Sequence, residues 1–256
     1  MGIALRMIHL ARRCGADFVK FQAFQAYQLV NPGPIADFCQ QCEFTEAQHK
    51  LLIYNCDNLN IEYLASAFDM DSVRMLKSLK QDRIKIPSGQ LTNKKLLRLI
   101  AEMGFYRIYL STGMCTIDEI SEALDILRQT GATVTLMQCT TSYPCRIQDA
   151  NLRVLEYYIK YFQIPVGFSD HTKGHAAACA AVALGASTIE KHFMLDESEM
   201  KCLNDGIETP DACVSAKGYE LKDFIYNIRM AEASLGDGCK RILDCEQKML
   251  CRKDRQ

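Results

Sequence analysis

The sequence predicts an α/β protein, specifically a TIM (β/α)8-type barrel that lacks its first strand. Short apolar runs alternate with longer amphipathic segments along the chain, which indicates parallel strands connected by helices. Polar residues, including histidines and lysines, follow several of these runs, at the edge where such barrels build their sites. The chain also opens on a helix, whereas a complete barrel opens on a strand.

Seven strands are expected, and each is followed by a helix. The expected strands are Asp17–Gln22, Ile61–Ala67, Arg83–Ile86, Arg107–Ser111, Thr133–Cys139, Pro165–Phe168 and Ser187–Glu190. The expected helices are Ile3–Cys14, Glu46–Asn58, Asp71–Leu79, Lys94–Met103, Ile117–Thr130, Asn151–Phe162, Ala176–Ala186 and Gly218–Leu235. Residues 23–44 are expected to form an irregular loop. The barrel is expected over residues 1–236, followed by a charged tail over residues 237–256.

Local signals support the helix boundaries. Gly15 ends the first helix, since glycine is the residue that most readily terminates a helix. Thr45 and Thr116 begin helices, and Gln48 and Glu119 stand three residues later, as in a capping box. These signals fix where the connections between strands and helices lie.

An open doubly wound sheet is the alternative fold. It would usually carry a glycine-rich phosphate-binding turn after its first strand, and no such turn follows Gln22. The barrel is therefore preferred. Its gap is predicted between the strands Asp17–Gln22 and Ser187–Glu190, and unpaired strand edges there would favour aggregation.

Composition excludes several classes of function. The chain has 256 residues, 48% of them hydrophobic, and a formal net charge of −1, which argues against a nucleic-acid or anionic-membrane surface. No segment approaches the roughly 20 apolar residues of a membrane span. Residues 1–11 lack a signal-peptide pattern, so the thirteen cysteines indicate reduced thiols and a cytoplasmic protein. Cys39-x-x-Cys42 is a lone pair, better explained by scattered loop thiols than by zinc or redox chemistry.

Two histidines follow two consecutive strands, and they are the strongest indication of a site. His171 and His192 should leave the same edge of the barrel. Neutral imidazoles suit a borderline divalent metal, and Asp170 is a candidate carboxylate to orient one of them. The alternative is that each histidine is a capped or packed loop residue. The matched positions favour the metal site.

Further polar residues gather at the same edge. Lysines and hydroxyls suit a phosphate, and a divalent metal suits a polarised carbonyl or hydroxyl. Each residue alone is compatible with ordinary loop chemistry, and neither a Ser-His-Asp triad nor a covalent nucleophile is recognisable. Together they predict electrostatic and metal catalysis on a small phosphorylated substrate. The ring comprises Lys20, Gln22, Lys85, Ser88, Gln90, Ser111, Thr112, Thr140, Thr141, Tyr143, Ser169, Asp170, His171, Lys191 and His192.

Lys20 and Lys85 should point into the barrel mouth. A buried unpaired lysine is costly, so an anionic ligand is the expected partner. The alternative is an internal ion pair with Asp17, Glu190 or Asp170.

Several of these segments carry a resemblance. GADFVKFQAF, KIPSGQLTN, LSTGM, QCTTSYP, VGFSDHTKG and VALGASTIEKHFMLD resemble the sialic acid synthase family, the bacterial N-acetylneuraminate synthases and their legionaminic and pseudaminic acid relatives. The resemblance covers residues 1–236. It implies condensation of phosphoenolpyruvate with an open-chain N-acetylhexosamine, either N-acetylmannosamine or a 2,4-diacetamido sugar. The implied product is a nine-carbon 2-keto sugar acid, formed with release of phosphate.

The resemblance also implies roles for individual residues. The metal ligands are His171 and His192, usually serving manganese, with magnesium or cobalt as alternatives. The catalytic candidates are His171, His192, Tyr143 and Gln90. The phosphoenolpyruvate-binding candidates are Lys20, Lys85, Ser88, Ser111, Thr141 and Ser169. The sugar-binding candidates are Gln22, Tyr143 and Asp211.

This sequence departs from the family pattern in several places. The family's first strand ends in a motif like EIGxNHxG, whose Glu is implicated in proton handling, and only Met1-Gly2 of that region could remain here. Gln90 stands where many members have Glu, and Thr141 stands where some have Asn. The loop over residues 197–209 looks longer than usual. The C-terminal antifreeze-like domain, which supplies an Arg to the partner's sugar site in the family's dimer, is absent.

Three functions are compatible with the sequence. The first is an active synthase of the sialic acid type. The second is an impaired relative that binds phosphoenolpyruvate without turnover. The third is another metal-dependent barrel enzyme, such as an aldolase. The expected partners are small-molecule substrates, with no nucleic acid or membrane, and a homodimer is the assembly that the family suggests.

Overall fold

The computed structural model describes residues 1–29, 32–129, 131–196 and 211–252. Seven strands form one sheet in sequential order, and every neighbouring pair is parallel. The strands are β1 (Phe18–Ala23), β2 (Glu62–Ala67), β3 (Arg83–Ile86), β4 (Arg107–Ser111), β5 (Thr133–Cys139), β6 (Val166–Asp170) and β7 (Thr188–Lys191).

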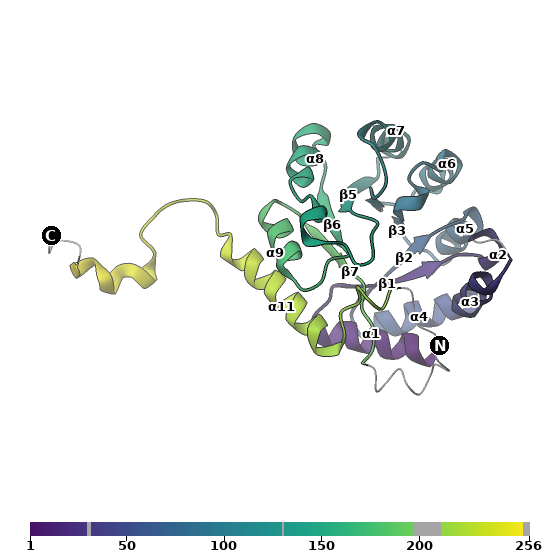
Figure 1. Cartoon of the computed structure of the whole chain (residues 1–256), viewed down its shortest axis with the longest axis horizontal. Helices are drawn as coiled ribbons and strands as arrows, with labels where there is room; N and C mark the ends of the chain where they lie inside the picture. Colours follow the sequence, from purple (N-terminus) through teal and green to yellow (C-terminus); the bar gives the residue numbers. More distant parts are fainter. Residues whose placement is uncertain (30–31, 130, 197–210, 253–256) are drawn as a thin grey trace.

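Helices surround the strands on the outside (Figure 1). The α-helices are α1 (Gly2–Cys14), α2 (Ala26–Leu29), α3 (Pro34–Cys42), α4 (Glu46–Asn58), α5 (Met70–Ser78), α6 (Lys94–Glu102), α7 (Ile117–Arg128), α8 (Val154–Phe162), α9 (Ala176–Ala183) and α11 (Gly218–Ser234). The short 3-10 helices are η1 (Ser88–Gln90), η2 (Ile147–Ala150) and η3 (Asp244–Arg252). The sheet curls around its inner face, and the result is a barrel that is not closed.

The predicted gap is confirmed. Among the described residues, β1 pairs only with β2 and β7 only with β6, so the outer edges of β1 and β7 carry no strand partner. Helices α1 and α11 contact each other on this side of the molecule (Figure 1). We call the space between the facing edges of β1 and β7 the seam.

The core lies between the outer face of the sheet and the helices. Ile84, Ile86, Leu110, Leu136 and Phe168 are all essentially inaccessible to solvent and belong to this core. A separate apolar cluster fills the lower part of the inner face, formed by Phe18, Leu64, Tyr109 and Met137. Because side chains alternate between faces along a strand, each strand supplies both layers.

Gly167 shows how tightly the inner layer is filled. A Cβ built at Gly167 would lie 2.3 Å from the sulfur of Met137 and 2.6 Å from the carbonyl oxygen of Thr188. The absence of a side chain on β6 therefore leaves the space that Met137 occupies.

One prediction of local structure is wrong. Residues 23–44 were expected to be irregular, but they contain α2 and α3. Helix α3 begins with Pro34 directly after Gly33, and proline is favourable at the first helical position because it has no N–H to leave unpaired. The capping boxes predicted at Thr45 and Thr116 are both present.

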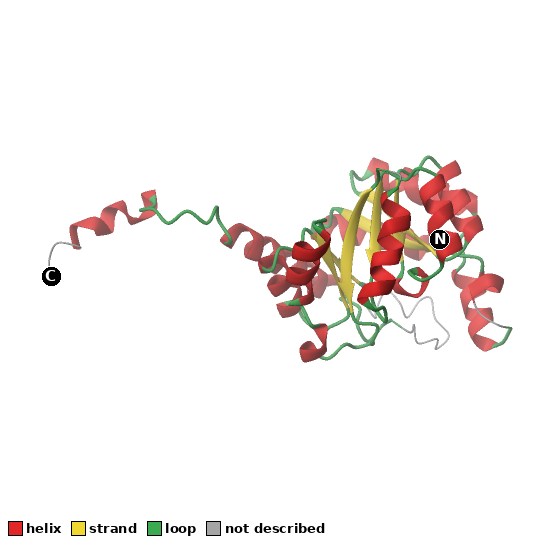
Figure 2. Ribbon diagram, turned by 90° about the horizontal axis from the view of Figure 1, so that it is seen from above, coloured by secondary structure: helices red, strands yellow, loops and turns green. Residues whose placement is uncertain are grey.

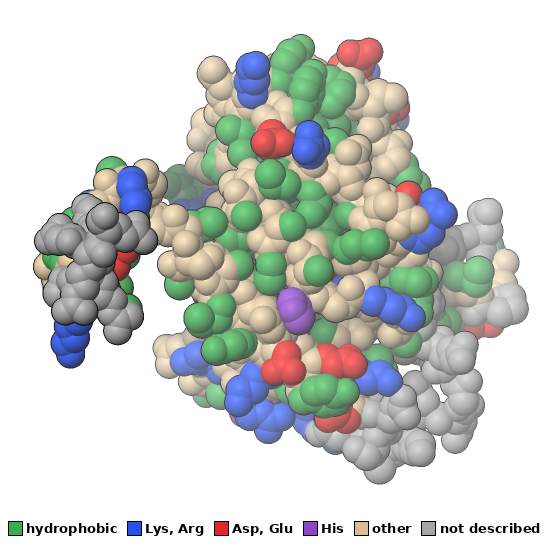
Figure 3. All heavy atoms as spheres, turned by 60° about the vertical axis from the view of Figure 1, so that its left-hand side comes forward, with side chains coloured by type: hydrophobic (Ala, Val, Ile, Leu, Met, Phe, Trp, Pro, Cys, Tyr) green, Lys and Arg blue, Asp and Glu red, His purple; other side chains and the backbone are tan. Residues whose placement is uncertain are grey.

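The chain leaves the barrel after α11, and the last described element, η3, is well separated from the sheet (Figures 1 and 2). Acidic and basic side chains are interspersed on the face shown in Figure 3. None of the described helices is long and apolar enough to span a membrane.

Candidate active site

Three charged side chains from distant strands meet on the inner face above the apolar cluster. Lys20 on β1 lies 3.1 Å from Glu190 on β7, measured from Nζ to Oε1. Lys85 on β3 contacts the other carboxylate oxygen of Glu190. Lys85 is only 3% exposed. Lys20 also donates a hydrogen bond of 3.2 Å to the hydroxyl of Ser66 on β2.

The ion pair with Glu190, stated above as the alternative for both lysines, is present in the structure. Asp17 and Asp170, the other two carboxylates considered, pair elsewhere, with Arg229 and Lys191. Glu190 is partly buried, which alone would raise its pKa, but Lys85 and Lys20 hold the pKa of this carboxyl well below its usual range. One carboxylate serves two lysines, so the cluster keeps an excess positive charge that suits an anion.

The two predicted histidines lie next to each other at the carboxyl ends of β6 and β7. Their ring centroids are 5.3 Å apart, and the ring of Tyr143 lies 4.2 Å from that of His171 and 5.8 Å from that of His192. The structure therefore brings together the two predicted metal ligands and the predicted catalytic tyrosine.

Both imidazoles are oriented through Nδ1. The Nδ1 of His171 donates to the carbonyl oxygen of Thr140 at 2.9 Å, since a carbonyl can only accept. The Nδ1 of His192 lies 3.2 Å from Oδ2 of Asp211. Burial lowers the pKa of His171, which favours the neutral ring, and the bond to His192 lowers the pKa of Asp211. This arrangement leaves each Nε2 as the nitrogen with a free lone pair.

The expectation that Asp170 orients a histidine is wrong. Asp170 is fully buried, accepts a hydrogen bond from the backbone N–H of Thr172 at 2.7 Å, and lies 3.5 Å from Nζ of Lys191. It stabilises the loop that follows β6 rather than touching an imidazole. The ring of His192 is oriented by the carboxylate of Asp211, and the ring of His171 is oriented by the backbone carbonyl of Thr140.

Three loops converge at Gly113. Its backbone N–H donates to the hydroxyl of Ser88 at 3.0 Å, and a Cβ at this position would lie 2.2 Å from the hydroxyl of Thr141. Only glycine leaves room for Ser88 and Thr141 to meet there. The buried hydroxyl of Ser111 has no hydrogen-bond partner among the described residues. Two predicted phosphate-binding hydroxyls are thus side by side, and a third is unsatisfied.

Sequence reasoning missed several residues of this site. Glu190 was considered only as an ion-pair partner, although it links both lysines. Ser66 contacts Lys20, and its position two residues after Leu64 places it on the inner face by strand periodicity. Cys139 is buried at the end of β5, with its sulfur 3.9 Å from Nδ1 of His171.

Other predicted residues lie apart from this cluster or serve the framework. The side-chain oxygen of Gln90 accepts a hydrogen bond from Asn93 at 2.9 Å. Thr112 is buried and donates to the carbonyl of Met137. Gln22 lines a cavity between β1, β7, α1 and α11. Their roles in binding stay predictions.

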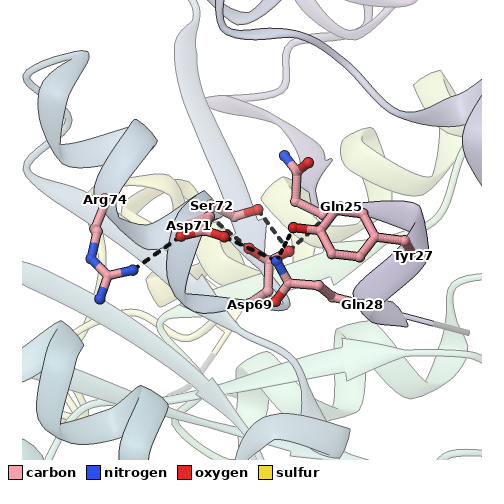
Figure 4. Close-up of polar contacts among 7 residues, drawn as sticks. All are labelled: Gln25, Tyr27, Gln28, Asp69, Asp71, Ser72 and Arg74. Carbon is pink, nitrogen blue, oxygen red and sulfur yellow. Dashed lines mark hydrogen bonds and ion pairs between the residues drawn. The ribbon is translucent and has the colours of Figure 1, made fainter.

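A polar network that the sequence did not reveal fixes the chain where it leaves β1 (Figure 4). Asp69 caps α5 through Ser72 and also accepts a hydrogen bond of 2.8 Å from the backbone N–H of Gln25. Asp71 accepts a hydrogen bond of 3.0 Å from Gln28. These contacts join the segment after Gln22 to the segment after β2, at the edge of the sheet that carries the site.

The two imidazoles of His171 and His192 are of the type that binds a divalent metal. No group of three or more His, Cys, Asp or Glu side chains suited to a metal occurs among the described residues. A metal site at this pair of histidines stays a prediction.

The fold and these side chains define a β/α-barrel enzyme with a cationic, histidine-bearing site at the carboxyl ends of its strands. The chain belongs to the NeuB family, whose model matches residues 7–240. The predicted resemblance to sialic acid synthases is thereby confirmed.

Individual relatives agree with this assignment. The chain is 38% identical over 266 residues to an N,N'-diacetyllegionaminic acid synthase of Campylobacter jejuni, covering 97% of this chain and 77% of that protein. It is 31% identical over 261 residues to the N-acetylneuraminate-9-phosphate synthase of Homo sapiens, covering 96% and 70%. Among solved structures, an N-acetylneuraminic acid synthetase from Leptospira borgpetersenii matches with a TM-score of 0.88 and 29% identity, covering 99% of this chain and 86% of that chain.

Proposed function

We propose that this chain carries the phosphoenolpyruvate-binding site of a sialic acid-type synthase. The reaction would condense phosphoenolpyruvate with an N-acetylhexosamine, N-acetylmannosamine or a 2,4-diacetamido sugar. The observation that supports the proposal most is the Lys20–Glu190–Lys85 cluster, because its excess positive charge lies on the same face as two histidines. Several relatives are named as synthases of N,N'-diacetyllegionaminic acid, N-acetylneuraminate 9-phosphate or pseudaminic acid, and these names support the same reaction.

The charge and hydrogen-bonding groups of each residue suggest which substrate it binds. Lys20 and Lys85 attract the phosphate and carboxylate of phosphoenolpyruvate, and the hydroxyls of Ser88, Ser111, Thr141 and Ser169 donate hydrogen bonds to them. Tyr143 and Asp211 face the sugar. Burial raises the pKa of Tyr143, so its hydroxyl keeps its proton and can donate it in a hydrogen bond.

The bond changes follow from the substrates. The methylene carbon of phosphoenolpyruvate attacks the aldehyde carbon of the open-chain sugar and forms the new C–C bond. Water adds at the carbon that bears the phosphate, and loss of inorganic phosphate leaves the 2-keto acid. A divalent metal held by His171 and His192, most simply manganese, would supply Lewis-acid polarisation of the aldehyde.

Binding without turnover is the second candidate. Gln90 favours it, since an amide cannot accept or release a proton as the Glu of many family members can. We also propose that the protein is cytoplasmic and forms a homodimer.

A thermal-shift titration with phosphoenolpyruvate tests the proposal. The wild type should gain stability by mass action, whereas the double variant Lys20→Met, Lys85→Met should not. Lys94→Met is the matched control, because Lys94 carries the same charge on the exposed surface of α6. Circular dichroism should show that each variant is folded.

An assay for 2-keto acid from phosphoenolpyruvate and N-acetylmannosamine then separates synthesis from binding alone. Equal shifts for wild type and double variant, or no shift for well-folded wild type, would refute the phosphoenolpyruvate site.

A further inference from the structure

An ion pair at the ends of β6 and β7 lies directly beside the two histidines. Asp170 and Lys191 are register partners of these parallel strands, and Oδ2 of Asp170 lies 3.5 Å from Nζ of Lys191. Each is the last residue of its strand, and a histidine follows it, His171 after β6 and His192 after β7. Because side chains alternate along a strand, both point away from the inner face that carries Glu190. The pair joins β7 to its neighbour on the side opposite the seam.

The ion pair is buried among apolar side chains. Asp170 is inaccessible to solvent, and the side chain of Lys191 is 6% exposed. Nζ of Lys191 lies 5.5 Å from the centre of the Phe224 ring on α11, and Phe224 belongs to an apolar cluster with Val182 and Ile228. Apolar side chains would pack β6 against β7 in such surroundings without the removal of two charges from water. Packing alone therefore does not explain why these two positions are charged.

The ion pair holds both peptide groups of Thr172, the residue after His171. Oδ1 of Asp170 accepts a hydrogen bond of 2.7 Å from the backbone N–H of Thr172. Nζ of Lys191 donates a hydrogen bond to the backbone carbonyl of the same residue. Thr172 is 1% exposed, so apolar side chains in place of the pair would leave these backbone groups buried without partners, which is costly. His171 thus lies between two residues that the ion pair fixes.

The histidine rings have contacts of their own, but these do not set the distance between them. The rings of His171 and His192 bond to Thr140 and Asp211, which lie outside the strands. Those bonds determine how each ring is turned. The separation of the two backbones is set where β6 and β7 end, and the ion pair joins the strands at that point.

We propose that Asp170 and Lys191 are positioning residues that hold His171 and His192 side by side at the site. The inference deepens the proposed function and rests on it, because that function is what gives the two histidines a role. The pair itself contacts neither substrate. Its loss should loosen the histidines and leave the Lys20–Glu190–Lys85 cluster on the inner face unchanged.

The first test compares two neighbouring amides of the wild type by hydrogen exchange, followed by NMR. The N–H of Thr172 is bonded to a buried carboxylate, whereas Lys173 is exposed. The amide of Thr172 should exchange at least about a hundredfold more slowly than that of Lys173. This measurement needs no variant.

The second test removes both charges together in the double variant Asp170→Asn, Lys191→Met, so that neither charge stays buried alone. The probe is diethyl pyrocarbonate, which acylates neutral imidazole nitrogens, and mass spectrometry identifies the modified histidines. His171 is only 4% exposed and should react slowly in the wild type. It should react at least about tenfold faster in the double variant, while His9 on the exposed side of α1 keeps its rate.

Val182→Ala is the matched control for a general loss of packing. It loosens the apolar cluster that contains Phe224 but keeps the ion pair, so His171 should react at the wild-type rate. Circular dichroism should show that both variants are folded. If the double variant does not fold, the exchange rates of the wild-type amides decide.

Three results would overturn the proposal. They are equal exchange of the Thr172 and Lys173 amides, unchanged reactivity of His171 in the folded double variant, and an equal increase of that reactivity in Val182→Ala. A thermal-shift titration with phosphoenolpyruvate, run in parallel, should give the same shift for wild type and double variant. Loss of the shift in the double variant alone would indicate collapse of the whole site and would also contradict the proposal.

Failure of the proposed function gives a different result. Absence of the phosphoenolpyruvate shift in the wild type would refute the phosphoenolpyruvate site. Exchange of the amides and acylation of the histidines are measured without substrate, so they test the positioning role in either case.

Discussion

The outer face of the sheet carries apolar side chains and the inner face carries charged ones, and the short strand β3 shows both. Ile84 and Ile86 point outward into the helix-covered core and are fully buried. Lys85 lies between them, points inward, and is almost as buried, yet it is charged and paired with Glu190. The outer face is built for burial of apolar surface, whereas the inner face places charge where a ligand can reach it. Burial alone therefore does not distinguish framework from site in this protein.

Breaking the ion pair between Lys85 and Glu190 should lower the free energy of unfolding more than the other substitutions considered below. Glu190→Gln leaves Lys85 buried without its countercharge, which costs about 3–5 kcal/mol of unfolding free energy. Chemical denaturation measures the loss, and phosphoenolpyruvate should restore more stability to the variant than it adds to the wild type. An unchanged unfolding free energy would show that Lys85 does not depend on Glu190.

Adjacent residues of β4 allow a matched comparison of the two faces. Leu110→Ala should cost about 2–5 kcal/mol, because it opens a cavity in the outer core. Ser111→Ala on the inner face should change stability by less than about 0.5 kcal/mol, since its hydroxyl has no partner among the described residues, but it should weaken phosphoenolpyruvate binding. Denaturation and thermal-shift titration of both variants check this. The contrast fails if both substitutions destabilise equally.

His49 is a titratable group on the outer, framework side. It is fully buried in α4, its Nδ1 lies 2.6 Å from the hydroxyl of Tyr63, and burial lowers its pKa from 6.5 to about 4. As the pH falls, the unfolded chain is protonated at His49 before the folded chain is. The contribution of neutral His49 to the free energy of unfolding is therefore complete above pH 6.5 and is lost progressively as the pH falls toward 4. The loss should reach about 3 kcal/mol. Unfolding curves across this range should be less pH-dependent in His49→Leu; equal slopes would contradict the assignment.

The affinity of the protein for manganese should depend on His171 and His192 and not on the residues of the apolar core. His171→Ala and His192→Ala should each lower manganese affinity by about a hundredfold, or about 2.7 kcal/mol, with little change in fold. Calorimetry measures the affinity. His175→Ala, which changes an exposed histidine outside the described contacts of the pair, is the matched control. Unchanged affinity in the double variant would remove the metal site.

Much of the fold was predictable because local patterns agree with the tertiary structure. The seven strands, the position of the gap, and the capping boxes at Thr45 and Thr116 follow from periodicity and capping chemistry. Helices α2 and α3 were not predicted, since their composition resembles a loop. Their placement depends in part on contacts such as the bond from the backbone of Ala26 to Glu43.

The sequence by itself determined which residues reach the carboxyl ends of the strands, because alternation and strand order place Lys20, Lys85, His171 and His192 on one face and one edge. Only the tertiary structure decided their partners. Glu190 lies 170 residues after Lys20 and 105 after Lys85, yet curvature of the sheet brings all three together. Asp211, and not Asp170, meets a histidine, because Asp170 turns toward Lys191. The choice of partner depends on distances set by the curvature and packing of the whole sheet, and no local pattern encodes those distances.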